Sequence, residues 1–408
     1  MSELSYLEKL LDGVEVEWKA VGDIAGYSTT KVDADKLDAT SFVGVDNLLA
    51  DKGGRIDATY QPNTARLTAY EPGDILLGNI RPYLKKVWMA ENNGGCSGDV
   101  LAIRILADCK KIISPEYLYY ALSSDSFFSY SMQHAKGAKM PRGSKDAILN
   151  YQIPIPCPSA PEKSLAIQSE IVRILDKFTA ITAELTAEFN MRKKQYNYYR
   201  DQLLSFKEGE VEWKALEEVS DIYDSLHQTP QYSKNGLSMI RVTDIKNGYI
   251  DLKNTLKVND GIFSIFTKKY LPQKNDLVMS RVGSYGNVGI IPTDNSACMG
   301  QNTVVIHPYI NNRYLFYILT SSIGQDFIEK NVGGGSQKTL SLKSIKSIPI
   351  PLTGESEQSK IVSILDKFDT LTNSITEGLP REIELRQKQY EYYRDLLFSF
   401  PKPETVSN

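Results

Sequence analysis

The 408-residue chain lacks several features that would assign it at once to a class of protein. No apolar run approaches the roughly 20 residues that a membrane-spanning helix needs. The first residues, MSELSYLEKLLDG, carry no basic segment followed by an apolar one. The four cysteines, Cys96, Cys109, Cys157 and Cys298, have no CxxC spacing and no neighbouring histidine cluster. We therefore expect no membrane span, no disulfide framework, no metal site and a reducing, cytoplasmic location.

The sequence also lacks the motifs of common enzymes. Residues 333–339 (GGGSQKT) are similar to a P-loop but place Gln337 where a glycine must precede the lysine. The spacing of Gly283, Gly286 and Gly289 does not match the dinucleotide-binding fingerprint. No Asn-Pro-Pro-Tyr-like motif of adenine methylation is present, and the three histidines lie far apart. We expect no catalytic residue and no cofactor in this chain; a single-protein enzyme with an unrecognised site stays an alternative.

What the sequence does contain is a tandem duplication. Four blocks occur twice in the same order, 190 to 195 residues apart: EVEWKA at 15–20 and 210–215, IPIP at 153–156 and 348–351, ILDKF at 174–178 and 364–368, and QYNYYRD at 195–201 with QYEYYRD at 389–395. Four blocks repeated in one order indicate two copies of one structural unit.

Each copy begins with a segment that is rich in glycine, asparagine, threonine and β-branched residues. Short apolar runs bounded by turn residues predict strands at 74–77, 100–103 and 276–279. Apolar periodicity predicts short helices at 115–122 and 313–319. We expect two compact, mixed α/β globular domains, at residues 18–157 and 209–353.

Each copy ends in a long helical pattern, at residues 158–208 and 354–408. Apolar residues at alternating steps of three and four make the narrow seam that is typical of a coiled coil. Each helix would span ~40 residues, or roughly 60 Å. Between its repeated ends the second helix is four residues longer, and Gly378 and Pro380 lie within it, which predicts a break or kink.

The N-terminal segment, residues 1–17, is predicted to be helical. Its sequence YLEKLL resembles YRDQLL at the end of the first long helix, so we expect it to dock near the end of the second. The predicted fold class is therefore α+β: two globular domains separated by two long antiparallel helices that form a coiled coil, as a tandem repeat with pseudo-two-fold symmetry.

This arrangement resembles the specificity subunit of Type I restriction-modification enzymes. The resemblance covers nearly the whole chain and rests on both IPIP blocks, both ILDKF and YYRD blocks, YEPGDILLGNIRPY at 70–83, NDLVMSRVGSYGN at 275–287, PRGS at 141–144 and SQKTLS at 336–341. It implies that each globular domain is a target recognition domain that reads one half of a bipartite DNA target. It also implies that the helices set the gap and dock two methyltransferase subunits.

The resemblance implies the partners and cofactors as well. Double-stranded DNA would be the ligand, and restriction subunits would complete the full complex. S-adenosylmethionine would be held by the methyltransferase partner, and ATP and Mg by the restriction partner, so that this chain itself is non-catalytic. Two readers on one rod would place half-site centres about 10 base pairs apart, with an unread gap of roughly six. Because the two domains differ in sequence, the target would be non-palindromic.

The distribution of charge indicates where DNA is contacted. Residues 213–353 carry 15 Lys and Arg against 11 Asp and Glu, whereas residues 354–408 carry 7 against 10. Cations gather in two glycine-containing loops, at 134–145 and 333–346, where backbone amides can approach phosphates and polar side chains can read base edges. The predicted DNA-binding residues are Arg81, Lys85, Lys86, Lys136, Lys139, Arg142, Ser144, Lys145, Arg281, Ser336, Gln337, Lys338, Lys343 and Lys346.

The residues that both long helices share predict a binding surface for two copies of one partner. Tyrosine and arginine are enriched at interface hot spots, although core packing explains each tyrosine equally well. The predicted partner-binding residues are Tyr196, Tyr199, Arg200, Tyr390, Tyr393 and Arg394. The alternative function is a coiled-coil scaffold with protein-binding end domains, which would show no salt-dependent affinity for DNA.

Overall fold

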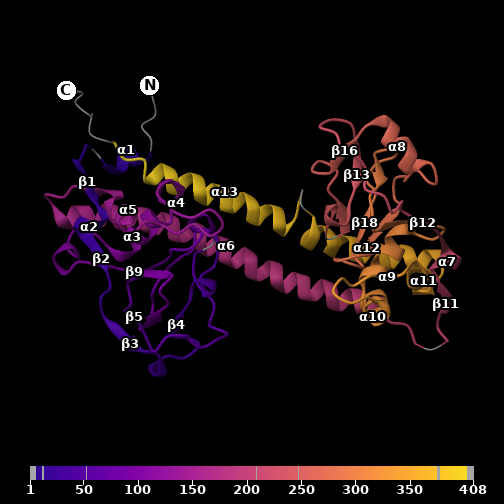
Figure 1. Cartoon of the computed structure of the whole chain (residues 1–408), viewed down its shortest axis with the longest axis horizontal. Helices are drawn as coiled ribbons and strands as arrows, with labels where there is room; N and C mark the ends of the chain where they lie inside the picture. The colour runs from indigo at the N-terminus through magenta and orange to yellow at the C-terminus, as the bar shows by residue number, and fades with distance from the viewer. Residues whose placement is uncertain are drawn as a thin grey trace. The chain divides into compact units, whose positions relative to one another are not determined.

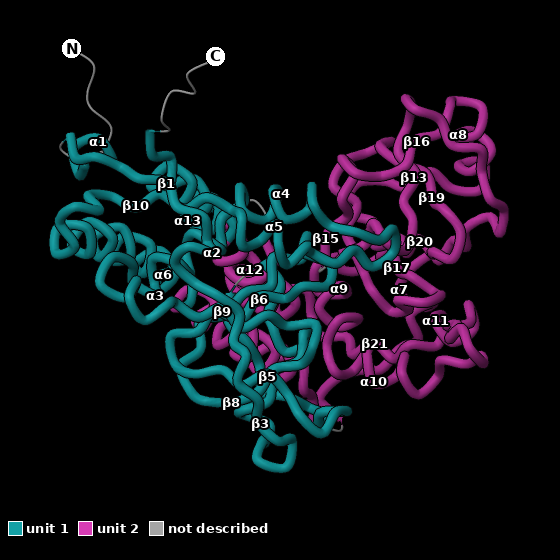
Figure 2. Tube along the Cα trace, turned by 60° about the vertical axis from the view of Figure 1, so that its left-hand side comes forward, with its two compact units in different colours: residues 1–183, 384–408 teal, residues 184–383 magenta. Residues whose placement is uncertain are grey.

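The structure, a computed structural model, describes residues 6–11, 13–51, 53–207, 209–246, 248–374 and 377–401. The chain divides into two compact units (Figure 1, Figure 2). Unit 1 consists of Met1–Ala183 with Glu384–Asn408, and unit 2 consists of Glu184–Ile383. Each unit therefore contains a segment of the long helical region of the other copy of the repeat.

The described strands of unit 1 form three sheets. The first has the order β2–β9–β6–β7, at Ala25–Tyr27, Val100–Ile105, Ile75–Gly78 and Val87–Met89. The second has the order β3–β5–β8–β4, at Lys31–Asp33, Arg66–Tyr70, Gly94–Cys96 and Phe42–Val43. In the third, β1 (Val16–Ala20) pairs antiparallel with β10 (Gln152–Pro156), so the EVEWKA and IPIP blocks are neighbours.

The short helices of unit 1 are α1 to α5, at Tyr6–Leu11, Val21–Ile24, Pro115–Leu122, Asp125–Gln133 and Lys145–Asn150. Helix α3 begins as its sequence predicts. The Ser114 side chain accepts a hydrogen bond from the Tyr117 amide, and Pro115 occupies the first turn, where its missing N–H costs nothing. Buried Tyr117 donates a hydrogen bond to the Pro154 carbonyl, 2.8 Å away, and so fixes α3 against β10.

The described strands of unit 2 repeat this plan with additions. A six-stranded sheet has the order β12–β20–β17–β18–β15–β14, at Ser220–Asp224, Thr303–Pro308, Leu277–Ser280, Val288–Ile290, Gly248–Ile250 and Ile245–Lys246. A second sheet has the order β16–β13–β19, at Leu256–Val258, Leu237–Ile240 and Ala297–Met299. Strand β11 (Glu212–Ala215) pairs antiparallel with β21 (Pro349–Leu352), as β1 does with β10.

The short helices of unit 2 are α7 to α11, at Leu216–Val219, Asp260–Thr267, Asn312–Thr320, Ser322–Asn331 and Leu342–Lys346. Helix α9 is the counterpart of α3. Its Tyr314 is buried and donates to the Pro351 carbonyl at 2.8 Å, the same contact that Tyr117 makes in unit 1.

The long helices confirm the predicted α+β class. Helix α6 (Pro161–Leu203) is continuous over 43 residues, begins in unit 1 and ends in unit 2. The second copy is divided into α12 (Glu355–Asn373) and α13 (Leu379–Leu397), and α13 begins in unit 2 and ends in unit 1. Gly378 has φ +84°, where a Cβ would collide with the Thr370 carbonyl oxygen. The predicted break is confirmed. None of the described helices is both long and apolar enough to span a membrane.

The predicted N-terminal helical segment contains α1 at Tyr6–Leu11, whereas residues 1–5 and 12 lie outside the described residues and Val16 and Glu17 belong to β1; α1 docks near the end of α13, as expected. Leu7 and Leu11 of α1 belong to the same hydrophobic core as Leu397 and Phe400 after α13. The Trp18 indole donates to the carbonyl of Pro401 at 2.9 Å, which ties β1 to the end of the described chain. Unit 1 is therefore closed by segments that are almost 400 residues apart in the sequence.

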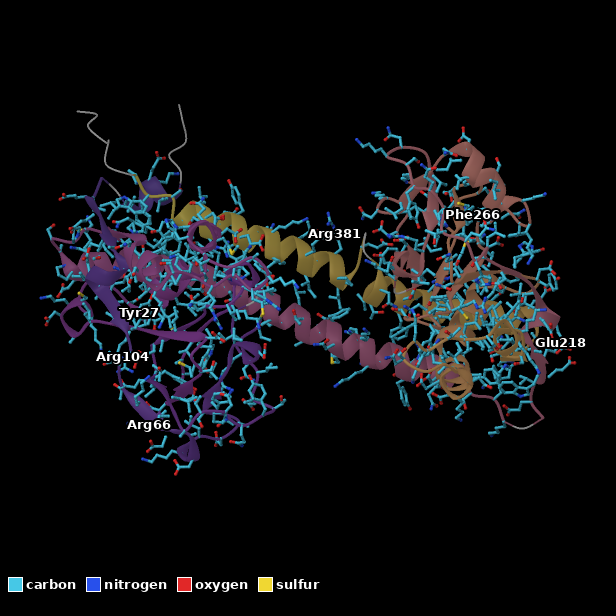
Figure 3. The ribbon with its side chains drawn as sticks, in the orientation of Figure 1. Tyr27, Arg66, Arg104, Glu218, Phe266 and Arg381 are labelled. Atoms are coloured by element: carbon cyan, nitrogen blue, oxygen red, sulfur yellow. The ribbon has the colours of Figure 1, made fainter. Side chains whose placement is uncertain are left out.

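Two buried acids show how the copies diverge within a shared frame. Asp74 and Asp276 directly precede β6 and β17, and both are buried. In unit 1, Arg104 belongs to strand β9 and is labelled in Figure 3. Its Nη2 lies 2.7 Å from the Asp74 carboxylate. In unit 2, Asp276 instead accepts from the Tyr270 hydroxyl at 2.8 Å and lies 2.7 Å from His307 Nδ1. A buried carboxylate is costly without partners, so each copy keeps the acid and supplies a different partner.

Candidate nucleic-acid interface and helix surface

One of the two predicted DNA-binding loops is a closed hairpin in unit 1, residues 136–142 (hairpin 1). The Lys136 amide donates to the Arg142 carbonyl at 2.9 Å, and the Arg142 amide donates back to the Lys136 carbonyl at 2.8 Å. Gly137 has φ +107°, and a Cβ there would lie 3.3 Å from the Met140 carbonyl oxygen. The paired neck and the glycine fix the backbone, so the exposed side chains project from a defined loop.

The second predicted loop is the same hairpin in unit 2, residues 333–339 (hairpin 2). The Gly333 amide donates to the Thr339 carbonyl at 3.0 Å, and the Thr339 amide donates back at 2.7 Å. Gly334 has φ +106° and faces the Gln337 carbonyl, as Gly137 faces that of Met140. The two hairpins therefore correspond residue by residue, 197 positions apart.

Both hairpins are attached to the chain that follows the central strand of their unit. In unit 1 the Arg81 amide donates to the Pro141 carbonyl at 2.7 Å, and the Gly143 amide donates to the Asn79 carbonyl at 2.9 Å. In unit 2 the Leu340 amide donates to the Arg281 carbonyl at 2.8 Å in the corresponding place. Each hairpin neck is thus hydrogen-bonded within itself and also to the chain after a sheet strand. The position of each hairpin is therefore fixed by its sheet.

The predicted cations in and next to hairpin 1 are largely available to a ligand. Arg81, Lys136 and Lys139 are exposed, and none of them has a side-chain partner among the described residues. Arg142 is also exposed but pairs with Asp99 at 3.0 Å. The Lys145 ammonium lies 6.0 Å from the centre of the Tyr27 ring, whose hydroxyl donates to the Lys145 carbonyl (Figure 3).

Two predicted contacts in the neighbouring turn are engaged within the protein. Arg81 and Lys85 both have left-handed backbone conformations, with φ of +53° and +48°. The Lys85 ammonium pairs with Asp125 at 2.8 Å, and the Lys86 ammonium donates to the Val45 carbonyl at 2.7 Å. Left-handed non-glycine residues are strained, so these two contacts hold a turn that would otherwise relax.

The predicted cations of unit 2 are more often paired. Lys338 lies 3.4 Å from Glu329, which raises the pKa of that ammonium, and Lys346 lies 3.3 Å from Glu217. Lys343 is exposed, as are Ser336 and Gln337 of hairpin 2.

Arg281 is the least exposed of the predicted unit 2 cations, with 12% of its side chain accessible. Its Nη1 donates to Asp224 at 2.7 Å, and its Nε donates to the Leu340 carbonyl at 3.1 Å. The second of these bonds fixes Leu340, which is the residue that follows the neck of hairpin 2.

Ser144, a predicted DNA contact, is the N-cap residue of a helix, so its hydroxyl oxygen already has a partner within the protein. Its side chain accepts from the Ala147 amide at 3.3 Å and caps α5. Ser341 caps α11 in the same way and accepts from the Ser344 amide at 3.0 Å. A capping serine followed by a short helix therefore marks the end of both hairpins.

The predicted partner-binding residues divide into an inner and an outer set. Tyr196 and Arg394 are buried, Tyr390 and Arg200 are half-buried, and the two arginines lie over the tyrosine rings. Burial raises the pKa of Tyr390 to about 12. Arg394 Nη1 donates to the Ser123 carbonyl at 3.0 Å. These side chains pack within their units.

The outer set includes two residues that sequence reasoning missed. Tyr199 and Tyr393 are 45% and 40% exposed, and their neighbours Tyr198 and Tyr392 are 61% and 64% exposed. In each pair the rings meet edge to face, with centroids 5.4 and 5.3 Å apart. The signal was present in the repeated YYRD block, but the helical seam alone did not show that the first tyrosine of each pair faces outward.

The described residues contain no group of three or more His, Cys, Asp or Glu side chains that could hold a metal ion. All four cysteines are free thiols. The candidate site consists of the two hairpins and, in each unit, a pair of exposed tyrosines on a helix.

Comparison with known proteins identifies one family. The Type I restriction modification DNA specificity domain matches residues 72–191 and 208–385. The specificity subunit of the EcoR124I and EcoR124II Type I restriction enzymes of Escherichia coli is 42% identical over 426 residues, with 100% of both chains covered. The specificity subunit of the EcoprrI enzyme of Escherichia coli is 33% identical, covering 92% of this chain and 93% of that one.

A solved structure supports the fold. The crystal structure of a Type I restriction-modification S subunit from M. genitalium has a TM-score of 0.53 at 13% identity, covering 96% of this chain and 98% of that chain. At that identity the likeness concerns the fold alone.

Proposed function

Because this chain belongs to the family of Type I restriction-modification DNA specificity subunits, we propose that hairpins 1 and 2 are its DNA-reading elements. Each unit reads one half of a two-part target. The observation that carries the proposal is that the same closed hairpin occurs once in each unit, with exposed and chemically different side chains. A scaffold has no need to keep one loop backbone twice while changing its exposed residues.

The predicted DNA-binding residues have two kinds of task in this proposal. Exposed cations such as Arg81, Lys136 and Lys139 contact phosphates and fix the register of the duplex. An indirect role falls to Lys85, Lys86 and Arg281. Their contacts within the protein hold the turn and the hairpin neck that carry the exposed cations. The remaining residues lie at the hairpin or in the helix after it: Arg142, Ser144, Lys145, Ser336, Gln337, Lys338, Lys343 and Lys346.

The two half-sites differ in this proposal, so the target is not a palindrome. At equivalent hairpin positions unit 1 presents Lys136, Lys139 and Arg142, where unit 2 presents Gly333, Ser336 and Thr339. Because the exposed groups differ in hydrogen-bonding chemistry, the two hairpins do not contact the same base edges. Helix α6, which runs unbroken from unit 1 into unit 2, sets the gap between the half-sites.

The helices dock two methyltransferase subunits, one for each unit. The equivalent outward pairs Tyr198–Tyr199 and Tyr392–Tyr393 suit two copies of one partner, because they repeat both sequence and exposure. Exposed tyrosines provide large contact areas at a low entropy cost. The methyltransferase holds S-adenosylmethionine, restriction subunits in the full complex use ATP and Mg, and the assembly acts on cytoplasmic DNA.

The test is to express the chain with its cognate methyltransferase subunit in a host without DNA methylation and to sequence the modified adenines. We expect one two-part motif with a fixed gap. Replacing Lys136 and Lys139 by alanine should reduce modification without changing the gap. A stable complex that modifies nothing would contradict the proposal and favour the scaffold.

A further inference from the structure

The tips of the two hairpins differ in one chemical respect that bears on base reading. Met140 and Gln337 occupy the same place, three residues after the left-handed glycine and two before the end of the neck. Met140 is 50% exposed, and Gln337 is exposed as well. Neither side chain has a hydrogen-bond partner among the residues that the structure describes. The two units thus present an apolar and an amide group from one backbone position.

Resting on the proposed function above, we propose that Met140 and Gln337 are equivalent base-reading positions that help to make the two half-sites different. Gln337 reads an adenine, and Met140 contacts the methyl group of a thymine. An amide matches the N6 donor and N7 acceptor of adenine in the major groove, while the thymine methyl is the one apolar group on that edge. Phosphate-binding neighbours cannot supply this distinction, since phosphates are the same in every sequence.

The geometry favours these two positions over their neighbours. A Cβ on the glycine would lie 3.3 Å from the Met140 carbonyl oxygen in unit 1 and 2.5 Å from the Gln337 carbonyl oxygen in unit 2, so both tips make the same close backbone approach. The neck is bonded reciprocally and is also attached to the sheet, so a side chain at the tip is presented from a rigid support. Rigid presentation is what a bidentate contact to a base edge requires, because the two hydrogen bonds must form together.

Other exposed residues of the hairpins fit base reading less well. Lys139 and Ser336 are equivalent to each other, and a lysine is suited to a phosphate as a point charge. Lys338 is held by Glu329 and is equivalent to Pro141, which has no polar side chain. Met140 and Gln337 are therefore the pair in which both side chains are exposed and neither is a phosphate-binding cation or held by a partner within the protein.

The test uses the full chain in complex with its methyltransferase subunit, with sequencing of modified adenines as the readout. Gln337→Met should lower discrimination at one base position of one half-site by about 10- to 100-fold. Gln337→Glu should change the preferred base there from adenine to cytosine, whose N4 amino group donates to a carboxylate. Met140→Gln should introduce a preference for adenine in the other half-site. The gap and the untouched half-site should stay the same.

Two control variants separate base reading from general effects. Gln231→Met makes the same chemical change at another exposed position of unit 2 and should leave the motif unchanged. Ser336→Ala alters hairpin 2 beside the tip and should weaken modification at every site equally. Each variant is checked for assembly with the methyltransferase, and Gln337→Ala, which also removes the amide, replaces Gln337→Met if the latter does not assemble.

The outcomes distinguish this inference from the proposed function. If the wild-type complex yields a two-part motif and all tip variants keep both half-sites, the tips do not read bases and the inference is overturned. It is also overturned if the variants change only the extent of modification. If the wild-type complex yields no two-part motif, the proposed function itself has failed.

Discussion

The ring of Phe178 stacks on the ring of Tyr393, with centroids 5.2 Å apart and planes inclined by 21°. Phe178 belongs to the ILDKF block of the first copy and Tyr393 to the YYRD block of the second, and both lie in unit 1. In unit 2 the other two members of these blocks, Phe368 and Tyr199, stack at 5.5 Å and 27°. Each unit is therefore completed by the helix of the opposite copy, and neither copy of the repeat forms a whole unit alone.

Removal of one stack should destabilise one unit. Phe178→Ala is expected to cost unit 1 about 2 kcal/mol, because it removes a half-buried ring and an aromatic pair. Hydrogen exchange should show faster opening of residues 384–397 and little change in α12. Phe368→Ala is the matched variant and should act on unit 2 instead. Equal loss of protection in both units after Phe178→Ala would contradict this assignment.

The cations of hairpin 1 should determine part of the salt dependence of DNA binding. Lys136→Ala and Lys139→Ala are each expected to reduce the slope of log affinity against log salt by about 1, because each removes one phosphate contact. The measurement is a salt titration of the chain in complex with its methyltransferase. Lys111→Ala, an exposed lysine elsewhere in unit 1, should leave the slope unchanged.

The outward tyrosines should control partner stoichiometry. Tyr198→Ala and Tyr392→Ala are each expected to weaken one methyltransferase site by about 30-fold, the size of a hot-spot loss. Native mass spectrometry at limiting concentration should then show one bound subunit in place of two. Because these rings are 61% and 64% exposed, thermal unfolding of the chain should change little. Two subunits bound as in the wild type would exclude these rings as contacts.

Arg394 should matter more for stability than an arginine on the helix surface. Its side chain is buried, and besides the bond to Ser123 its Nη2 lies 3.2 Å from Asp125. Arg394→Ala is expected to cost about 2 to 3 kcal/mol in the free energy of unfolding of unit 1, because charged hydrogen bonds are lost. Arg192→Ala removes only surface contacts, with Glu188 and with the Gln195 side chain, and should cost less than about 0.5 kcal/mol. Urea unfolding compares the two variants.

The thiols should differ in reactivity according to burial. Burial raises the pKa of Cys96 and of Cys298 to about 12, so at pH 8 only about one thiol in ten thousand is ionised at each. Labelling of the native chain with a thiolate-specific reagent at pH 8 should therefore be confined to Cys109 and Cys157, which are partly exposed. All four should react in denaturant. Rapid native labelling of Cys96 would show that its burial is not maintained in solution.

Part of the candidate site could be predicted from the sequence, and part of it could not. The two loops, their glycines and their cations are local features, and the sequence predicted them at 134–145 and 333–346. The roles of Lys85 and Arg281 depended on Asp125 and Asp224, which are 40 and 57 residues away, and no local pattern links them. The equivalence of Met140 and Gln337 was hidden because the repeat is exact only in the flanking blocks, while the hairpins share backbone bonds and one glycine, Gly137 or Gly334, but otherwise differ in sequence.

The sequence by itself determined the duplication, the order of globular and helical segments, the break at Gly378 and the family. These follow from repeated blocks and from periodicity, which are properties of neighbouring residues. The tertiary structure alone decided which copy completes which unit and that both tyrosines of each pair face outward. The physical reason is that burial depends on which distant segment covers a helix face, and that segment can lie almost 400 residues away in the chain.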